Sequence, residues 1–481
     1  MFHTVSQLRQ IEQQASKQGL PLMQRAGRAA ADFISRRFGK AAPIGVLVGP
    51  GNNGGDALVA ATLLRQLGYT LSVCMPAGPG SLPADAATAY RDWQRCGGTE
   101  SAQAPTGACT VIIDGLFGLG LNRPLAPHWQ ALITQVNQLG KPILALDVPS
   151  GVHADSGALL GAPIQARWTL SFIGQARGLA TGAARDYTGL CLLDKLGLVA
   201  PTLDQAALPD TATVAQTIRI ARAADSHKGS YGTICIIGGA EGMTGAALLA
   251  GRAALQAGAG KVFTGLLGPV PSADLVRPEL MLRPADTLLM DAADLILLGP
   301  GLGQGAPAAD LLHHALSSQQ ALVLDADALN LLASDPRLTQ AARLREAPTV
   351  LTPHPAEAAR LLACSTAEVQ QHRYDAAAEL ARRYHATIVL KGAGTVLVDG
   401  ALMAVNQSGS AALANAGQGD LLSGLIAALM AQGLNAWQAT CLATHLHGCA
   451  SDALVNRDGR GITLANEVIA ELDRHLAPYF R

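Results

Sequence analysis

This 481-residue sequence has a formal net charge of only -1 and lacks a Cys-x-x-Cys pair and a long apolar run. Its 35 lysines and arginines balance 36 acidic residues, so no overall field favours nucleic acid or an anionic membrane. The eight cysteines lie mostly in apolar stretches, as reduced core thiols do. The longest apolar helix that the sequence predicts, over residues 421–430, is about half a membrane span, and the polar residues 1–19 show no signal peptide. We therefore expect a cytoplasmic protein that binds neither nucleic acid nor membrane.

A chain of this length is too long for one ordinary core and predicts two domains. Short β-type runs alternate with helical runs, as in parallel sheets covered by helices on both faces. The pattern lapses between about residues 197 and 224, and we place the boundary there, with domains over residues 1–215 and 222–481. The fold class is α/β, with two three-layer domains. Strands are predicted over residues 44–48, 71–75, 110–114, 143–147 and 168–172, and then over 233–237, 295–298, 321–324, 349–351 and 387–390.

A glycine-rich segment, residues 49–56, follows the first strand and precedes a helix predicted from Asp56 to residue 67. Its Gly49-x-Gly51-x-x-Gly54 spacing matches the dinucleotide fingerprint, in which backbone N–H groups approach a pyrophosphate. The fingerprint also needs an acidic residue after the second strand, and residues 71–76 contain none, which disfavours an ordinary NAD dehydrogenase. The oxygens of Asn52, Asn53 and Asp56 suit a hard monovalent cation or a ribose.

Two further polar clusters follow strands of the first half, where ligands bind in open α/β sheets. One runs from Asp114 through residues 118–124, and the other runs from Asp147 to Gly151. Either cluster alone is as easily a turn with a capping aspartate. Together with residues 49–56 they predict one crevice lined by three strand ends.

These motifs resemble the epimerase domain of NAD(P)H-hydrate repair enzymes, which is Rossmann-like, over about residues 5–215. The resemblance implies that Asn53, Asp114 and Ser150 hold a potassium ion and that Asp147 contacts the substrate near its reacting carbon. Asp147 is then our candidate acid/base for interconverting the C6 epimers, and the residue on the opposite face stays unassigned. The implied substrate-binding residues are Asn52, Asn53, Gly54, Gly55, Asp56, Gly118, Leu119, Gly120, Leu121, Asn122, Arg123, Pro124 and Asp147.

The strongest chemical signal of the second half is Gly417-Gln418-Gly419-Asp420, directly before an apolar helix. Backbone amides at a helix N-terminus can hold a transferring phosphoryl group, and the aspartate can take a proton from an attacking hydroxyl. The alternative is an aspartate that serves only as helix N-cap. Neither a Walker lysine motif nor the protein-kinase motifs occur.

The second half, over about residues 222–478, resembles the ribokinase-like superfamily and, within it, the ADP-dependent NAD(P)H-hydrate dehydratase domain. The resemblance rests on His227-Lys228-Gly229, the loop at 299–303, residues 325–330 and 352–355, and the loops at 391–395 and 415–420. Gln418 departs from the pattern, because relatives often carry Thr or Met there; since backbone amides bind the anion, we expect little harm. The implied hydrate-binding residues are Ala246, Gly301, Gly303, His354 and Asp420, and those for ADP are Lys391, Gly392, Ala393, Gly394, Thr395 and Gly419.

Both resemblances imply one repair function with NADHX, NADPHX and ADP as ligands. The first half would interconvert the R and S hydrates, and the second would dehydrate the S form, giving NAD(P)H, AMP and phosphate. Mg²⁺ is expected with ADP, with Asp325 and Asp327 as ligands or as structural caps. The rival readings are a kinase for a small vitamin precursor and a nucleotide-sensing or scaffold protein. A homo-oligomer is expected, although the sequence does not determine the oligomeric state.

Overall fold

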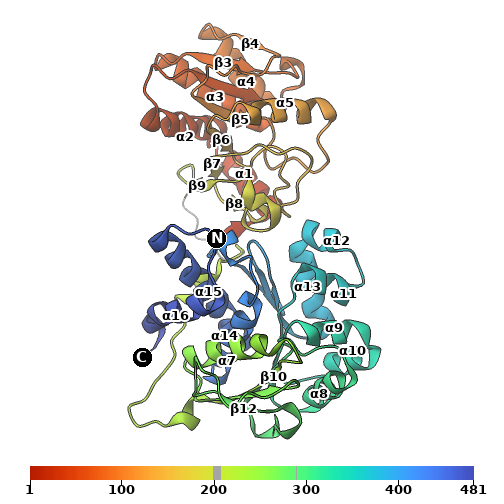
Figure 1. Ribbon diagram of the computed structural model, residues 1–481. Helices are drawn as coiled ribbons and strands as arrows, with labels where there is room; N and C mark the ends of the chain where they lie inside the picture. The colour runs from red at the N-terminus through yellow and green to blue at the C-terminus, as the bar shows by residue number, and fades with distance from the viewer. Residues whose placement is uncertain (199–206, 289, 481) are drawn as a thin grey trace. The chain divides into compact units, whose positions relative to one another are not determined.

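The computed structural model describes residues 1–198, 207–288 and 290–480, and the chain divides into two compact units, Met1–Leu208 and Pro209–Arg481 (Figure 1). The segment in which we placed the boundary lies partly at residues 199–206, outside the described residues. Residues 209–215, which the sequence analysis grouped with the first domain, belong to the second unit. There Ala215 is fully buried in the core, and Thr211 Oγ1 donates to Asn406 Oδ1 at 2.6 Å.

The first unit is built on a seven-stranded parallel sheet of order β4-β3-β2-β5-β6-β7-β9. Helices α2, α3 and α4 pack on one face and α5 on the other, which gives three layers. A further helix, α1, packs on a separate small core. The strands are β2 (Ile44–Val48), β3 (Leu71–Cys74), β4 (Glu100–Ser101), β5 (Val111–Gly115), β6 (Ile143–Leu146), β7 (Trp168–Phe172) and β9 (Leu190–Asp194), with β1 (Phe2–His3) paired to β8 (Gln175–Ala176); the helices are α1 (Val5–Lys17), α2 (Leu22–Arg37), α3 (Asn52–Gln66), α4 (Ala84–Arg95) and α5 (Pro127–Gln138).

The helix after the glycine-rich segment begins earlier than predicted. Helix α3 begins at Asn52 rather than at Asp56. Close packing explains why the helix contains two glycines. A Cβ at Gly54 would lie 2.2 Å from the carbonyl oxygen of Gly49, and one at Gly55 would lie 2.6 Å from Met23 Cε. The motif therefore serves as the first turn of a helix pressed onto the end of β2.

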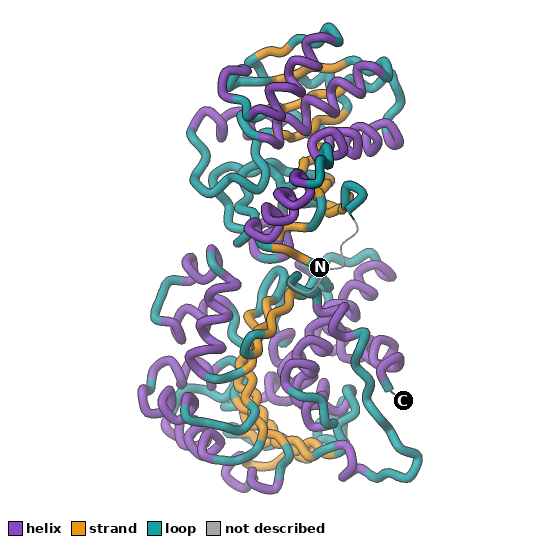
Figure 2. The backbone as a smooth tube through the Cα atoms, turned by 180° about the vertical axis from the view of Figure 1, so that it is seen from behind, coloured by secondary structure: helices purple, strands orange, loops and turns teal. Residues whose placement is uncertain are grey.

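The second unit contains a nine-stranded sheet of order β12-β11-β10-β13-β14-β15-β16-β17-β18, parallel as far as β16 and antiparallel after it. Helices lie on both sides of this sheet (Figure 2). The strands are β10 (Thr233–Gly238), β11 (Lys261–Leu266), β12 (Met281–Pro284), β13 (Leu295–Leu298), β14 (Ala321–Leu324), β15 (Thr349–Leu351), β16 (Thr387–Leu390), β17 (Val396–Asp399) and β18 (Leu402–Val405). The helices are α6 (Thr211–Ala215), α7 (Thr244–Gln256), α8 (Ala306–Ser317), α9 (Asp327–Ser334), α10 (Pro336–Arg343), α11 (Pro355–Leu362), α12 (Thr366–Gln371), α13 (Arg373–Tyr384), α14 (Gln418–Ala431), α15 (Ala436–Asp458) and α16 (Ala465–Leu476).

The predicted α/β class is confirmed, and every predicted strand is present with its ends within one residue. The prediction missed β1, β4, β8, β9, β11, β12 and the β17–β18 hairpin. Within the described ranges no helix combines the length and the hydropathy needed to cross a bilayer. In both sheets the order in which successive strands are added reverses at one point. This topological switch point lies between β2 and β5 in the first unit and between β10 and β13 in the second. Open α/β sheets bind ligands at such points.

Candidate active sites

A pocket of about 400 Å³ opens at the switch point of the first sheet. Its walls come from the segment after β2, the segment after β5, the end of β6, and helix α1. The structure thus brings together the three strand ends that the sequence placed in one crevice. The lining residues are Arg9, Glu12, Pro50, Gly51, Asn52, Asn53, Asp56, Leu116, Phe117, Gly118, Leu119, Gly120, Leu121, Asn122, Arg123 and Asp147.

Next to the pocket, Asp114 and Ser150 form a fully buried pair, and the Ser150 hydroxyl accepts a hydrogen bond from the backbone N–H of the pocket residue Phe117. Ser150 donates from its backbone to Asp114 Oδ2 at 2.9 Å and from its hydroxyl to Asp114 Oδ1 at 2.7 Å. Burial raises the pKa of Asp114 to about 6, although these hydrogen bonds act to lower it. Nearby Asn53 is only 9% exposed, and neither its Oδ1 nor its Nδ2 has a hydrogen-bond partner in the protein. Buried amide groups normally have partners, so the site offers unused oxygen to a ligand or a hard cation.

Asp147 lies at the end of β6 and points its carboxylate into the pocket. Its φ of +65° is unusual for a residue other than glycine and marks a position that the surrounding structure holds in place. Burial, followed by the charge of Glu12, raises the pKa of Asp147 to about 7, against hydrogen bonds from the backbone of Leu119 and Phe172. A carboxyl group with this pKa can both give and take a proton near neutral pH.

Gly118 keeps the approach to these groups open. A Cβ at this position would lie 3.2 Å from Asp147 Oδ2 and 3.3 Å from Asn53 Cγ, so the Asp147 carboxylate and the Asn53 amide flank the same point. Three residues implied by the resemblance do not line the pocket, namely Gly54 and Gly55, which pack inside the fold, and the exposed Pro124.

Two charged residues of the pocket, Arg9 and Glu12, were missed by the sequence analysis. Both come from α1, more than 30 residues before the first glycine motif. The polar face of an amphipathic helix carries no local sign that it covers a site. Only the packing of α1 reveals their place.

In the second unit, the carboxyl ends of β13, β14, β15 and β16 meet at one edge of the sheet. The central contact is an ion pair between Lys391, after β16, and Asp325, after β14, with Nζ and Oδ1 2.7 Å apart. The Asp325 side chain is 1% exposed and that of Lys391 19%. Burial alone would lower the pKa of Lys391, but the charges of Asp325 and Glu357 hold it above its usual range. Lys391 is therefore a fixed positive charge.

Asp420 lies in the first turn of α14, beside this ion pair. The N-cap of α14 is Gly417 and no side chain caps the helix, so the reading of Asp420 as N-cap is wrong. Burial and the charge of Asp325 raise the pKa of Asp420 to about 6, while Lys391 acts to lower it. A Cβ on the intervening Gly419 would lie 3.3 Å from Lys391 Nζ. A carboxylate, an ammonium group and the amides of a helix N-terminus therefore converge on one place, as phosphoryl transfer requires.

His354 follows β15 and is the N-cap of α11. Its Nδ1 accepts hydrogen bonds from the backbone N–H groups of Ala356 and Glu357 at 3.1 and 3.3 Å, and its Nε2 lies 3.2 Å from Glu357 Oε1. Burial and the charges of Lys391 and Arg360 lower the pKa of His354. The ring is therefore neutral at pH 7, and 47% of the side chain is exposed at the sheet edge.

The remaining predicted hydrate-binding residues lie at the β10–β13 end of the same edge. A Cβ at Gly301 would lie 3.2 Å from Ala246 Cβ in α7, and Gly303 donates its N–H to Asp327 Oδ2 at 2.9 Å. Asp327 is the first residue of α9 rather than its N-cap, and its carboxylate holds the loop at Gly303, whereas Asp325 holds Lys391. The start of α14 packs against α7, since a Cβ at Gly417 would lie 2.6 Å from Leu249 Cδ1.

Residues 391–395, implied to bind ADP, form the turn between β16 and β17. Thr395 Oγ1 donates to the carbonyl of Gly392 at 3.2 Å, and Ala393 is exposed while Gly394 is buried. The buried Arg373 of α13 donates from Nη2 to the carbonyl oxygens of Leu390 and Lys391, both at 3.1 Å. Arg373, which the sequence analysis missed, therefore fixes the start of this turn.

Gln418 turns its side chain into a buried network behind α14. Its Nε2 donates to the carbonyl oxygen of Thr463 at 2.7 Å, and its Oε1 lies 2.9 Å from Nε2 of the buried His447. Burial lowers the pKa of His447 to about 4, so the ring is neutral and donates from Nε2. The unusual residue at this position is thus accommodated by hydrogen bonds of its own, and its backbone amide stays at the helix terminus.

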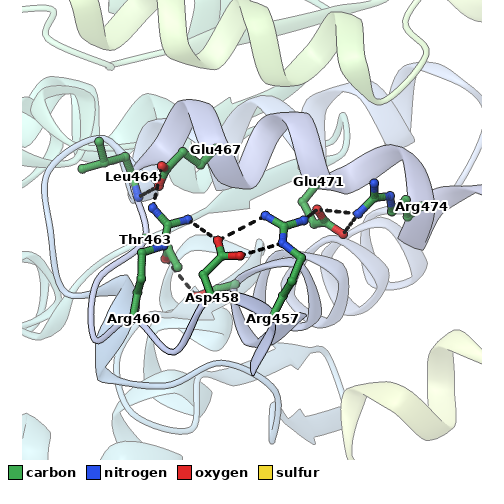
Figure 3. Close-up of polar contacts among 9 residues, drawn as sticks. Arg457, Asp458, Arg460, Thr463, Leu464, Glu467, Glu471 and Arg474 are labelled. Carbon is green, nitrogen blue, oxygen red and sulfur yellow. Dashed lines mark hydrogen bonds and ion pairs between the residues drawn. The ribbon is translucent and has the colours of Figure 1, made fainter. Parts of the chain in front are cut away.

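The loop that carries Thr463 is fixed by charged groups of α15 and α16 (Figure 3). Arg460 bridges Asp458 and Glu467, each at 2.8 Å, and Arg457 contacts Glu471 at 3.0 Å. A network of this kind holds a loop better than an isolated surface pair does.

We expect His447→Leu to lower the free energy of unfolding by about 1–3 kcal/mol, because Gln418 Oε1 would be left buried without a donor. The free energy of unfolding is measured by chemical denaturation, from the unfolding transition of the second unit. The exposed His313→Leu is the control and should leave the transition in place. Equal stability of both variants would contradict a contribution from the Gln418–His447 bond.

The fold and the geometry together define a class: a two-unit α/β enzyme with an acid-lined pocket at the sheet switch point of one unit and, in the other, a lysine–aspartate ion pair beside a helix N-terminus. Two family models match the chain, one described as YjeF-related protein N-terminus over residues 19–178 and one described as NAD(P)H-hydrate dehydratase over residues 234–474. The chain belongs to the family of bifunctional NAD(P)H-hydrate repair enzymes, which confirms the resemblance drawn from the motifs.

Sequence relatives that span nearly the whole chain, and one that spans the first unit, support this membership. The bifunctional repair enzyme of Vibrio cholerae is 38% identical over 98% of this chain and 97% of its own, and that of Escherichia coli is 38% identical over 95% and 89%. An NAD(P)H-hydrate epimerase of Achromobacter xylosoxidans is 54% identical over 41% of this chain and 96% of its own. Among solved structures, the ADP/ATP-dependent NAD(P)H-hydrate dehydratase of Bacillus subtilis, co-crystallised with ATP and Mg²⁺, is 31% identical, covers 56% of this chain and 99% of its own, and has a TM-score of 0.49.

Proposed function

We propose that this chain repairs hydrated nicotinamide nucleotides in two steps. The first unit interconverts the R and S forms of NADHX and NADPHX, and the second dehydrates the S form with ADP to give NADH or NADPH, AMP and phosphate. The observation that carries the proposal is the convergence of Asp420, the Asp325–Lys391 ion pair and the N-terminus of α14.

The chemistry of the second unit follows from the poor leaving ability of hydroxide. Asp420 accepts the proton of the C6 hydroxyl while the hydroxyl oxygen attacks the terminal phosphoryl group of ADP. AMP departs as the leaving group. Lys391 and the amides from Gly417 onward stabilise the charge that develops on the phosphoryl oxygens. The ring nitrogen then expels phosphate from C6, and loss of the C5 proton restores the double bond. Ala246, Gly301, Gly303 and His354 would position the hydrate, and residues 391–395 with Gly419 would bind ADP.

Mg²⁺ would enter this site on the nucleotide. Within the described parts of the chain, no group of three or more His, Cys, Asp or Glu side chains is placed to hold a metal ion. This fits an ion held mainly by phosphate oxygens and water, as Mg²⁺ usually is at nucleotide sites. When bound, it neutralises phosphate charge; we assign it no protein ligand.

In the first unit, C6 of the hydrate carries both a hydroxyl group and the ring nitrogen. Protonation of the hydroxyl lets the nitrogen lone pair expel water, which leaves C6 planar, and water can then return to the other face. Asp147, with its pKa near neutrality, would carry one of the protons. The residues at 52–56 and 118–124 would hold the dinucleotide.

A potassium ion fits the polar atoms next to this pocket. Asn53 Oδ1 is buried without a partner, and Asp114 and Ser150 bring further oxygens. The bound cation would supply positive charge next to the dinucleotide phosphates. Asn53, Asp114 and Ser150 would hold it.

The state of the cysteine thiols indicates the cellular compartment of the protein. All eight cysteines are free, and several of them are buried. We infer a reducing compartment such as the cytoplasm.

The proposal is tested by incubating the protein with a mixture of hydrated NADH epimers, ADP and Mg²⁺ and following the near-ultraviolet absorbance of NADH. Full recovery, dependent on ADP, is expected. Absence of recovery together with phosphorylation of a vitamin alcohol would favour the small-molecule kinase instead. Binding of the hydrate without turnover would favour a nucleotide sensor.

We expect the dehydration rate to depend on pH through Asp420. The group acts as a base and must be ionised, and its pKa is raised to about 6. The rate of S-hydrate turnover at saturating ADP should therefore fall as pH decreases through about 6 and level off above it. A rate that stays flat from pH 5 to 8 would contradict this assignment.

A further inference from the structure

Helix α1 places two charged residues in the epimerase pocket that the glycine and aspartate motifs do not include. Its inward residues Leu8 and Ile11 belong to a small core that also contains Val148, the neighbour of Asp147. Arg9 and Glu12 are one helical turn apart, and each comes directly after one of these inward residues. Both line the pocket. The helix therefore packs directly on the segment that presents Asp147.

The start of α1 is held firmly, so the position of Glu12 is well defined. Thr4 and Gln7 form a reciprocal capping box, with Gln7 N to Thr4 Oγ1 at 3.2 Å and Thr4 N to Gln7 Oε1 at 2.7 Å. Val5 N also donates to Asp155 Oδ1 at 2.9 Å.

Three carboxyl groups from three elements share this pocket: Glu12 from α1, Asp56 from α3 and Asp147 from the end of β6. Arg9 and Arg123 are the cationic residues of the lining. Burial raises the pKa of Glu12, which Arg9 acts to lower, and burial together with the charges of Asp147 and Glu12 raises the pKa of Asp56. Charges on neighbouring carboxyl groups oppose one another's ionisation, and Asp147, whose pKa is raised to about 7, is the group of this cluster that exchanges a proton near neutral pH.

Epimerisation at C6 needs two proton carriers, because water leaves from one face and returns to the other. An acid must protonate the departing hydroxyl, and a base must take a proton from the incoming water. In the reverse direction the two groups exchange roles, so two carboxyl groups that share a proton suit the task. Asp147 alone supplies only one of them.

We propose that Glu12 is the second proton carrier of the epimerase site, paired with Asp147 across the C6 carbon. One carboxylic acid gives its proton to the C6 hydroxyl, the C6–oxygen bond breaks and water departs while the ring nitrogen donates its lone pair. Water then forms a new C6–oxygen bond on the opposite face, and the other carboxylate takes the released proton. Arg9 and Asp56 set the charge balance of the pair. This inference rests on the proposed epimerase function.

The test uses the full-length chain and follows the two hydrates separately in the presence of ADP and Mg²⁺. Consumption of the S form reports the second unit, and consumption of the R form requires epimerisation first. We expect Glu12→Gln to slow R-form consumption by about 100-fold, the usual size of an acid/base contribution, with S-form turnover unchanged. Asp32→Asn, which removes an exposed carboxylate from the same unit, should leave both rates unchanged.

Glu12→Asp separates proton transfer from a purely structural role. A shorter carboxyl group should retain more epimerase activity than the glutamine variant, whereas a structural role would be served better by the isosteric glutamine. Near-ultraviolet circular dichroism of the first unit's tryptophans checks the fold of both variants. R-form consumption by Glu12→Gln within about threefold of the unsubstituted protein, or a glutamine variant more active than the aspartate variant, would overturn the assignment. Failure of the unsubstituted protein to consume the R form would instead contradict the proposed epimerase function.

Discussion

Replacing Asp420 by Asn should slow dehydration of the S hydrate by about 1,000-fold, within the range for loss of a general base. Asparagine has nearly the same shape but cannot accept the hydroxyl proton. Because burial raises the pKa of Asp420, its charge is unfavourable in the folded protein, so the substitution should not lower the free energy of unfolding. The measurement is the rate of NADH recovery from the S form at saturating ADP.

Two controls make this prediction specific. Asp310→Asn removes an exposed carboxylate of the same unit and should leave the rate unchanged. Epimerisation by the Asp420→Asn protein, measured as interconversion of the two hydrates without ADP, should also remain. Equal loss of both activities would mean that the two sites do not act separately.

Replacing Asp147 by Asn should slow epimerisation by about 1,000-fold and leave S-form dehydration unchanged, again because an acid/base group is removed. Asparagine is the informative choice because Asp147 has a φ of +65°, and asparagine tolerates this conformation better than alanine does. The backbone at the end of β6 should therefore stay in place. Loss of epimerisation can then be attributed to the carboxyl group.

The rate of R-form consumption with ADP present measures this effect, and the S form measured in the same tube reports the second unit. Asp32→Asn serves again as the exposed control. An Asp147→Asn protein that interconverts the hydrates at the normal rate would remove Asp147 from the mechanism. Other carboxyl groups of the pocket would then have to perform both proton transfers.

The sequence predicted the parts of the fold whose signals are local. Buried strands such as residues 44–48 and 295–298 stand out as apolar runs bounded by glycine-rich segments. Weaker strands were missed for identifiable reasons: β4 contains two residues, and β9 is an edge strand without a continuous buried pattern. The β17–β18 hairpin does carry a usable signal, Asp399-Gly400 between two apolar runs, which is a common hairpin turn.

In the candidate sites, too, local signals predicted some features, and others depend on contacts between distant segments. Asp114, Asp147, Lys391 and Asp420 follow strands or begin a helix, so their position at a sheet edge could be predicted from topology rules. The pairing of Asp325 with Lys391, 66 residues apart, could not, because it depends on which strands become neighbours in the sheet. The hydrogen bond between Gln418 and His447 likewise depends on the register of α15 against α14.

The sequence by itself determined the α/β class, the family and the chemistry available at each strand end, because these depend on residue types at fixed local spacings. Only the tertiary structure decided which groups from outside the strand ends join the pocket. Glu12 and Arg9 lie in an amphipathic helix far from every motif, and they reach the pocket because α1 packs its apolar face beside Val148. Contacts between distant segments depend on how apolar faces pack together, and this information is not present in any local stretch of the chain.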